Sequence, residues 1–363
     1  KEVIYNSSDS LYTLKYANLD INIPFGNISL DSVELIPNSA VYNKLVLAKD
    51  APNNQYYIKL ASLQIKHFSL TDVFFNRKLS ISNIILEQPD IQMTYEYHAF
   101  NDTLSTKPKK SLYDHIKGVF TAVNIKNVTI ENADFRYVKI EQWNKSQLAV
   151  QKVNINIQDI LLDSTSNLDS SRLFYTKMID VVVPTFTYNL PGGFYKVQFD
   201  NLHINTKDQF LKVSNLVYKP KMSKQAFFKK KGQNTTMNDV QFKEVRLNKL
   251  DFKRLIDRQQ IFGSTAEINN GLAKFSEDLR YPKIPKNKIG HAPYQQLMKV
   301  KSIFHFNTVY VNNVSVVYDD FSKKYNKEGS ISFNHATGTL ENVTNDSAIL
   351  SNNRFMRADL TAK

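Results

Sequence analysis

The chain has 363 residues, of which 42% are hydrophobic and 12% aromatic, which excludes general disorder and leaves room for one large domain or two ordinary ones. It contains no Cys, which excludes a disulfide framework and thiolate chemistry, and its net charge of +13 favours anionic partners such as phospholipid head groups, lipopolysaccharide or nucleic acid. No apolar run reaches the roughly 18 residues of a membrane span, so we expect any anchor or targeting signal to lie upstream.

Short segments of alternating polarity follow one another along the first half of the chain. With Φ for an apolar residue, they share the octet Φ-x-Φ-x-x-Φ-x-Φ, and they are rich in β-branched and aromatic residues. Alternation with a period of two predicts strands with one apolar face. The octets lie at 14–21, 28–35, 63–70, 79–86, 123–130 and 155–162.

The skipped pair at the centre of each octet needs a local correction of the backbone. Residues three apart in a regular strand point to opposite faces, so the octet would otherwise expose half of its apolar residues. Ten of the twelve pairs in the whole chain contain Asn or Asp, which tolerate left-handed or bulged conformations. We therefore predict bends or β-bulges, some with positive φ, at Asn18, Asn127, Asn201 and Asn313. A two-residue hairpin turn is the alternative, and it is disfavoured because all twelve pairs lack Gly.

Two short helices are expected, each after a Pro-Lys segment that predicts a loop. In the first half, "STKPKK" precedes "SLYDHIKGVF", where Ser111 is a predicted N-cap and Leu112, Ile116 and Val119 form one stripe. In the second half, "YPKIPKNK" precedes "PYQQLMKV" from Pro293. We expect both helices to close part of a groove or to pack across its end.

The second half repeats the pattern of the first. Octets occur at 197–204, 211–218, 245–252 and 309–316, with degraded versions at 261–268 and 338–345. The stretch Tyr12–Pro37 aligns without a gap to Tyr195–Pro220, 183 residues later, and three further matches keep the same order at offsets of 182, 186 and 183. We predict two tandem copies of one unit, in domains 1–175 and 176–363, with the second continuous with the first and truncated at its C-terminal end.

The predicted fold is mainly β. It is an elongated, curled antiparallel sheet that forms an open groove, with few short helices. An ordinary sandwich, in which the two copies bury their apolar faces on each other or on a second sheet, is the alternative.

The sequence offers no constellation for catalysis, so we expect no enzyme, no metal and no cofactor. The seven His residues form no HExxH pair, Gly192 and Gly193 make a lone turn, and no phosphate-binding Gly motif occurs. Asp319 and Asp320 are interpreted as a polar strand end and not as a catalytic pair of carboxylates.

A basic cluster lies between Tyr218 and Gly232. Its candidates for anionic head-group contact are Lys229, Lys230 and Lys231, next to Phe227 and Phe228. The cluster is predicted to lie in one inter-strand loop, where a merely solvated role remains an alternative. Cations beside aromatic rings can also bind single-stranded nucleic acid, but a single loop does not extend along a sheet face, and we expect no nucleic-acid partner.

Two phrases, "LSISNIILEQPDIQ" from Leu79 and "GSISFNHATGTLENVTND" from Gly329, together with the succession of octets, resemble the AsmA-like envelope proteins of Gram-negative bacteria, particularly the Bacteroidetes versions. The resemblance covers the chain from about Tyr12 onward. The chain departs from the family in lacking the amino-terminal transmembrane helix and in ending at "MRADLTAK".

This resemblance, which extends to bridge-like lipid transfer proteins, implies a periplasmic segment tethered to the inner membrane by an upstream helix. It would bind or conduct phospholipid or another acyl lipid and contribute to phospholipid transport and outer-membrane homeostasis. Contact with an anionic membrane surface is also compatible with the basic composition of the chain. The alternative is a non-lipid structural or protein-interaction module of the cell envelope.

The candidate groove residues are the apolar positions that flank the skipped pairs. In the first copy they are Leu19, Ile21, Leu30, Val33, Ile65, Phe68, Ile81, Ile84, Ile125 and Val128, and in the second Leu202, Ile204, Val213, Leu216, Leu247, Leu250, Val311 and Val314.

Overall fold

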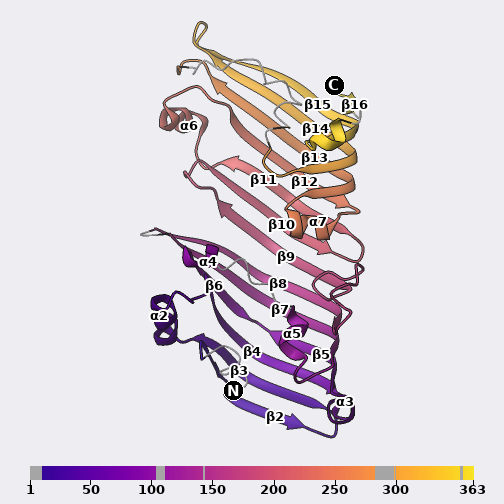
Figure 1. The fold of residues 1–363 in the computed structure, drawn as a ribbon. Coiled ribbons are helices and arrows are strands. Elements are labelled where there is room, and N and C mark those ends of the chain that lie inside the picture. Colours follow the sequence, from indigo (N-terminus) through magenta and orange to yellow (C-terminus); the bar gives the residue numbers. More distant parts are fainter. Residues whose placement is uncertain (1–9, 104–110, 142–143, 283–297, 299, 352–354) are drawn as a thin grey trace. The chain divides into compact units, whose positions relative to one another are not determined.

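The computed structural model describes residues 10–103, 111–141, 144–282, 298, 300–351 and 355–363. The chain divides into two compact units, Lys1–Pro184 and Thr185–Lys363. Long strands dominate both units and the helices are short, so the predicted mainly β class is confirmed (Figure 1).

The first unit contains strands that lie side by side in one layer. They are β1 (Tyr12–Lys15), β2 (Asn18–Asn22), β3 (Asn27–Pro37), β4 (Asn54–Phe68), β5 (Lys78–Glu87), β6 (Asp90–Glu96), β7 (Ala122–Glu141) and β8 (Asn144–Leu162). Strands β1 and β2 both pair with β3, and β3 pairs with β4. Strands β5 and β6 both lie between β4 and β7, and β7 pairs with β8. The described helices are α2 (Ser39–Leu47), α3 (Leu70–Asn76), α4 (Phe100–Thr103) and α5 (Leu112–Ile116). Strand β9 (Met178–Asn189) contains the boundary between the units.

The strands of the second unit follow one another in a similar order. Its strands are β10 (Tyr195–Asn205), β11 (Phe210–Pro220), β12 (Met237–Asn248), β13 (Ile261–Asp278), β14 (Phe304–Ser322), β15 (Lys327–Thr344) and β16 (Arg357–Thr361), paired in that order. The described helices are α6 (Lys224–Lys231), α7 (Phe252–Arg258) and α9 (Ser347–Leu350). Strand β10 stands where the first unit has β1 and β2, and β13 stands where it has β5 and β6. Duplication of one unit would explain this order, and superposition of the two units stays a prediction.

The expectation of a purely antiparallel sheet is wrong, because each unit contains parallel pairs. Strands β5 and β6 run parallel to β7, and β13 runs parallel to β14. Parallel neighbours need a crossover of about a dozen residues or more. The segments that provide it, 97–121 and 279–303, are the ones that carry the Pro-Lys stretches.

Left-handed residues correct the face of the apolar positions in most octets. In eight of the twelve skipped pairs the second residue has positive φ: Ser32, His67, Asp159, Asn201, Asn215, Lys249, Asn313 and Asn342. At Ser32 the register of β3 against β4 is the same on both sides, because Asp31 pairs with Ser62 and Val33 with Leu60. Such a left-handed residue returns the apolar side chains that follow it to the original face of the sheet without inserting an extra residue, whereas a bulge inserts a residue and shifts the register.

The four Asn residues at which bends or bulges were predicted have different conformations in the structure. Asn201 and Asn313 have φ of 46° and 56° and lie at register shifts, so both predictions are confirmed. Asn18 directly follows a bend at Ala17 that separates β1 from β2. At Asn127 the prediction is wrong, because this residue does not have positive φ and pairs with Gln158 where the register between β7 and β8 does not shift.

The predicted alignment of β7 with β14, at an offset of 186 residues, also differs from the alignment that the register shifts give. The register shift of β14 lies between Val311 and Val314, and that of β7 lies between Ile130 and Ala133. The left-handed residues at these shifts are Asn313 and Asn132, 181 residues apart and not 186. Because each long strand carries the apolar phrase more than once, a slip of five residues leaves the pattern intact.

Short helices were predicted incompletely. Helix α5 begins after Ser111, which forms the expected capping box with Asp114. Its stripe does not pack as expected, since Leu112 and Val119 are exposed. The helix expected from Pro293 falls largely outside the described residues, as do both Pro-Lys stretches. Helices α3 and α7 were missed because each has only seven residues.

Replacing Asn201 by Val is expected to lower the free energy of unfolding by about 1–3 kcal/mol, because a β-branched residue is strained at positive φ. Chemical denaturation measures this loss. Asn201→Gly should be close to neutral, and Asn127→Val should cost less than Asn201→Val because Asn127 lies in regular strand. Equal losses from the two Val variants would contradict the conformational explanation.

Candidate functional site

The apolar candidates of the first unit form rows that cross the sheet. One row runs through directly paired residues Ile21, Ile28, Ile65, Ile84, Val128 and Ile157. A second runs through Leu19, Leu30, Leu63, Leu86, Ile130 and Ile155, and a third through Phe68, Ile81, Ile125 and Ile160. Paired residues share a face, so these rows make one apolar surface in the unit.

The opposite face of the same strands is mostly polar. Next to Ile84, the row through Ile85 continues to Gln64 and Ser29 on one side and to Thr129 and Asn156 on the other. The unit is therefore amphipathic across the thickness of a single sheet.

The second unit repeats this arrangement. Its rows run through Ile204, Leu211, Leu247, Ala266, Val309 and Leu340, through Val213, Val245, Ile268, Val311 and Gly338, and through Leu216, Phe242, Gly271, Val314 and Ala336. A side chain at Gly271 would collide with the ring of Phe242, which lies across this position. The glycine lets the large ring lie flat within the row.

Burial of the eighteen candidates indicates a face that is open. Six are buried, namely Val33, Ile81, Val128, Val213, Leu250 and Val314; Leu19 and Ile21 are about half exposed, and the other ten are half-buried. A sandwich core would bury nearly all of them. Three candidates do not join these rows. Val33 pairs with Leu60, Leu250 lies between β12 and α7, and Leu202 lies in the irregular stretch of β10.

Two left-handed Asn residues of the second unit, Asn270 and Asn313, form an amide ladder with His335 that the sequence did not predict. Asn313 Nδ2 donates to Asn270 Oδ1 at 2.7 Å, and His335 Nδ1 donates to Asn313 Oδ1 at 2.6 Å. These three residues, with Asn215 and Lys243, line an open hollow of about 480 Å³. These hydrogen bonds connect β13, β14 and β15, three neighbouring strands that each have a left-handed residue at this level.

The basic cluster does not lie in a loop. Lys229, Lys230 and Lys231 form the last turn of α6, which Ser223 caps at its start and left-handed Gly232 caps at its end. Ser223 and Gly232 are residue types that often mark the start and the end of a helix, so the sequence contained a signal for α6. The lysines are exposed, and the ammonium groups of Lys230 and Lys231 lie 4.9 and 3.9 Å from the ring centre of Phe194.

The phenylalanines beside these lysines belong to a core. Phe227 and Phe228 are 1% and 0% exposed, and with Met237 they form a cluster against which Phe194 and Tyr195 pack. Their rings are therefore unavailable for stacking on bases or for insertion into a membrane. Only the charges of the lysines remain available to an anionic group.

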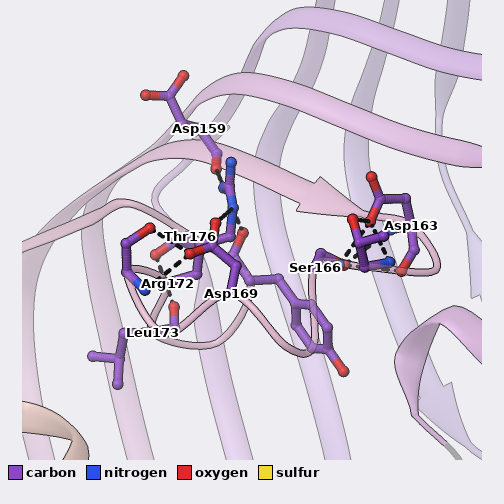
Figure 2. Close-up of polar contacts among 10 residues, drawn as sticks. Asp159, Asp163, Ser166, Asp169, Arg172, Leu173 and Thr176 are labelled. Carbon is purple, nitrogen blue, oxygen red and sulfur yellow. Dashed lines mark hydrogen bonds and ion pairs between the residues drawn. The ribbon is translucent and has the colours of Figure 1, made fainter.

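The acidic residues between β8 and β9 fold their own loop (Figure 2). The carboxylate of Asp163 accepts hydrogen bonds from the backbone N–H groups of Thr165 and Ser166 at 2.8 and 2.7 Å. Arg172 Nε donates to Asp169 Oδ2 at 3.0 Å, and its guanidinium also donates to the carbonyl oxygen of left-handed Asp159. Hydrogen bonds from Ser171 and the nearby charge of Arg172 lower the pKa of Asp169. These carboxylates are committed to holding the loop.

Asp319 is a buried residue within β14 and not a strand end as interpreted from the sequence. Its carboxylate lies 3.0 Å from the ammonium of Lys274 and 3.4 Å from that of Lys224 at the start of α6. This contact ties the helix to the sheet. Within the described ranges, no group of three or more His, Cys, Asp or Glu side chains is placed to hold a metal ion.

Asp278 makes a pH-dependent contribution to stability. Its carboxylate is 2% exposed and accepts two hydrogen bonds from Arg280, at 2.7 and 3.0 Å, which lower the pKa of Asp278. A lowered pKa stabilises the folded state above the unfolded pKa of about 3.9, and this stabilisation is lost as pH falls. We expect the free energy of unfolding to fall below about pH 4. In Asp278→Asn, denaturation between neutral pH and pH 3 should show a smaller fall; an unchanged fall would contradict this assignment.

None of the helices that the structure describes is long and apolar enough to cross a membrane. No protein-family model matches the chain, and a comparison with curated proteins finds no similar sequence. Among solved structures, the chain is compared with the crystal structure of the sex pheromone staph-cAM373 precursor, with 11% identity, coverage of 95% of this chain and 86% of that chain, and a TM-score of 0.15. That score carries no argument about fold or function. The similarity to AsmA-like proteins therefore depends on the sequence pattern alone.

Proposed function

We propose that the chain binds or conducts acyl lipid along the apolar faces of its sheets. In this proposal it is a periplasmic segment of an AsmA-like protein anchored in the inner membrane, and it contributes to phospholipid transport and outer-membrane homeostasis. The observation that carries the proposal is the continuity of the apolar rows from strand to strand on a face whose side chains are largely half-buried.

The dimensions of a row suit an acyl chain. Strands are spaced by about 4.8 Å, so the row from Ile21 to Ile157 across six strands measures roughly 24 Å. One leaflet of a bilayer has a hydrocarbon thickness of about 15 Å, half of the roughly 30 Å core. A row is therefore long enough to cover one acyl chain along its whole length.

The energetics favour an apolar occupant. Each Å² of apolar surface removed from water contributes about 25 cal/mol, so half-buried Ile and Leu side chains gain free energy when acyl chains cover them. The polar opposite face, with its amide ladder and ion pairs, has no comparable driving force for covering.

Native mass spectrometry of the protein purified from a membrane-containing bacterial lysate tests the proposal. The expected spectrum contains adducts with the masses of phospholipids, and solvent extraction of the same sample should recover them. A protein that carries no lipid, and that gains none when incubated with phospholipid dispersed in mild detergent, would contradict the proposal. A stoichiometric protein adduct in place of lipid would favour the structural-module alternative.

A further inference from the structure

One corner of the first unit exposes large apolar side chains from three separate segments. We call it the apolar corner: Ile23 and Phe25 in the turn between β2 and β3, Phe74 and Phe75 in α3, and Val119 after α5. Phe74 is 75% exposed, Phe75 83% and Phe25 67%. These side chains lie in segments that connect the ends of strands, outside the cross-strand rows.

Hydrogen bonds hold the three segments together. Phe68, just before α3, donates its N–H to the carbonyl of Gly26 at 2.9 Å, and Gly26 has φ of 61° and lies so close that a side chain there would strike the Phe68 backbone. Arg77, the left-handed cap of α3, donates from Nη2 to the carbonyl of Gly118 at 2.8 Å and accepts from the N–H of Thr121 at 2.8 Å. Figure 1 shows α3 at the end of the sheet next to β2. The corner is thus a fixed surface.

Positive charge borders the apolar corner. Arg77 and Lys78 follow Phe75 after one residue, and both are exposed. The carboxylate of Asp72 in α3 accepts from Asn76 Nδ2 at 3.1 Å. The carboxylate of Asp114 in α5 lies 2.7 Å from the ammonium of Lys117, the residue that follows this helix. Exposed aromatic rings flanked by cations match the chemistry of a bilayer surface that carries anionic head groups.

The second unit shows that the backbone does not require this apolar surface. Its corresponding turn, Asn205–Gln209, carries Thr206, Lys207 and Asp208 where the first unit has Ile23, Pro24 and Phe25. Its corresponding helix, α7, ends in left-handed Gln259 as α3 ends in Arg77. In α7 the residues at the places of Phe74 and Phe75 are Ile256 and Asp257, which gives this corner a polar character.

We infer that the apolar corner docks onto an anionic phospholipid bilayer, with Phe25, Phe74 and Phe75 inserted at the level of the head groups. Arg77 and Lys78 contact the phosphates. This docking is independent of lipid binding on the sheet faces, because it uses the edge of one unit and needs no bound acyl chain.

Vesicle sedimentation tests the inference. The full chain should bind vesicles of phosphatidylglycerol and phosphatidylethanolamine, and binding should weaken at high salt and with vesicles of phosphatidylcholine alone. The double variant Phe74→Ser with Phe75→Ser should lose at least about tenfold in affinity, since two aromatic rings no longer insert. The matched control Ile256→Ser in α7 should bind like the parent.

Insertion has its own spectroscopic readout. A Trp introduced as Phe74→Trp should shift its fluorescence to shorter wavelength when anionic vesicles are added, and Ile256→Trp should not. The inference is overturned if the parent does not bind anionic vesicles, if the double Ser variant binds as well as the parent, or if both Trp variants respond alike. A dimer in the absence of vesicles that the double Ser variant abolishes, without vesicle binding by the parent, would assign the corner to self-association and likewise overturn it.

Discussion

Ile84→Asp is expected to abolish copurification of lipid while leaving the fold largely intact. Ile84 lies at the middle of a cross-strand row, between Ile65 and Val128, and is half-buried. A carboxylate there would have to lose its water when an acyl chain covered the row, which costs several kcal/mol. In the lipid-free sheet the same carboxylate can remain partly hydrated, so thermal unfolding should shift by only a few degrees. The measurement is lipid content by mass spectrometry together with the unfolding temperature.

Ile85→Asp is the matched control. Ile85 is the next residue of β5 and is also half-buried, but its paired neighbours on the opposite face are Gln64 and Thr129. This variant should keep its lipid and lose similar stability. Loss of lipid in both variants, or in neither, would show that lipid binding does not depend on the apolar face. If Ile84→Asp failed to fold while Ile85→Asp folded, the apolar face would be an ordinary core.

Phe228→Ala is expected to destabilise the second unit by about 3–5 kcal/mol, the usual cost of emptying the site of a buried aromatic ring. The ring is 0% exposed, packs edge-on against Phe227 and stacks against Tyr281. Few of the residues that the structure describes are so completely buried, since a single-layer sheet has little interior. Denaturant titration should show the unfolding midpoint of this unit strongly lowered.

Phe74→Ala is the control for this prediction, because the same side chain type is there 75% exposed. Its free energy of unfolding should stay within about 0.5 kcal/mol of that of the parent. A loss at Phe228 no larger than that at Phe74 would show that the aromatic cluster is not the core of α6 and its neighbours.

The strands were predictable because alternation of polarity directly reflects a half-buried sheet. Octets such as 79–86 and 211–218 lie within β5 and β11, and in most octets, 211–218 among them, the break in alternation marks a residue with positive φ. Asn201 and Asn313 were predictable because Asn tolerates positive φ. Ser32 and Lys249 take the same conformation without any such preference, so here the tertiary structure overrides the residue type.

The remaining features depend on information that a local pattern lacks. The parallel pairing of β5 with β7 follows from the path of the chain between them, which apolar spacing does not encode. The displacement between Asn127 and Asn132 arose because successive phrases of one strand look alike. The burial of Phe227 and Phe228 was hidden by three lysines that follow them, since composition alone suggested a solvated loop.

Photo-crosslinking at single positions detects directly whether acyl chains touch the apolar face. A benzophenone amino acid replaces Ile84 in one variant and Ile85 in another, and each is irradiated in bacteria that express the protein. We expect a phospholipid-mass adduct from position 84 and none from position 85. Equal lipid adducts from both positions, or adducts only to protein from position 84, would contradict this expectation.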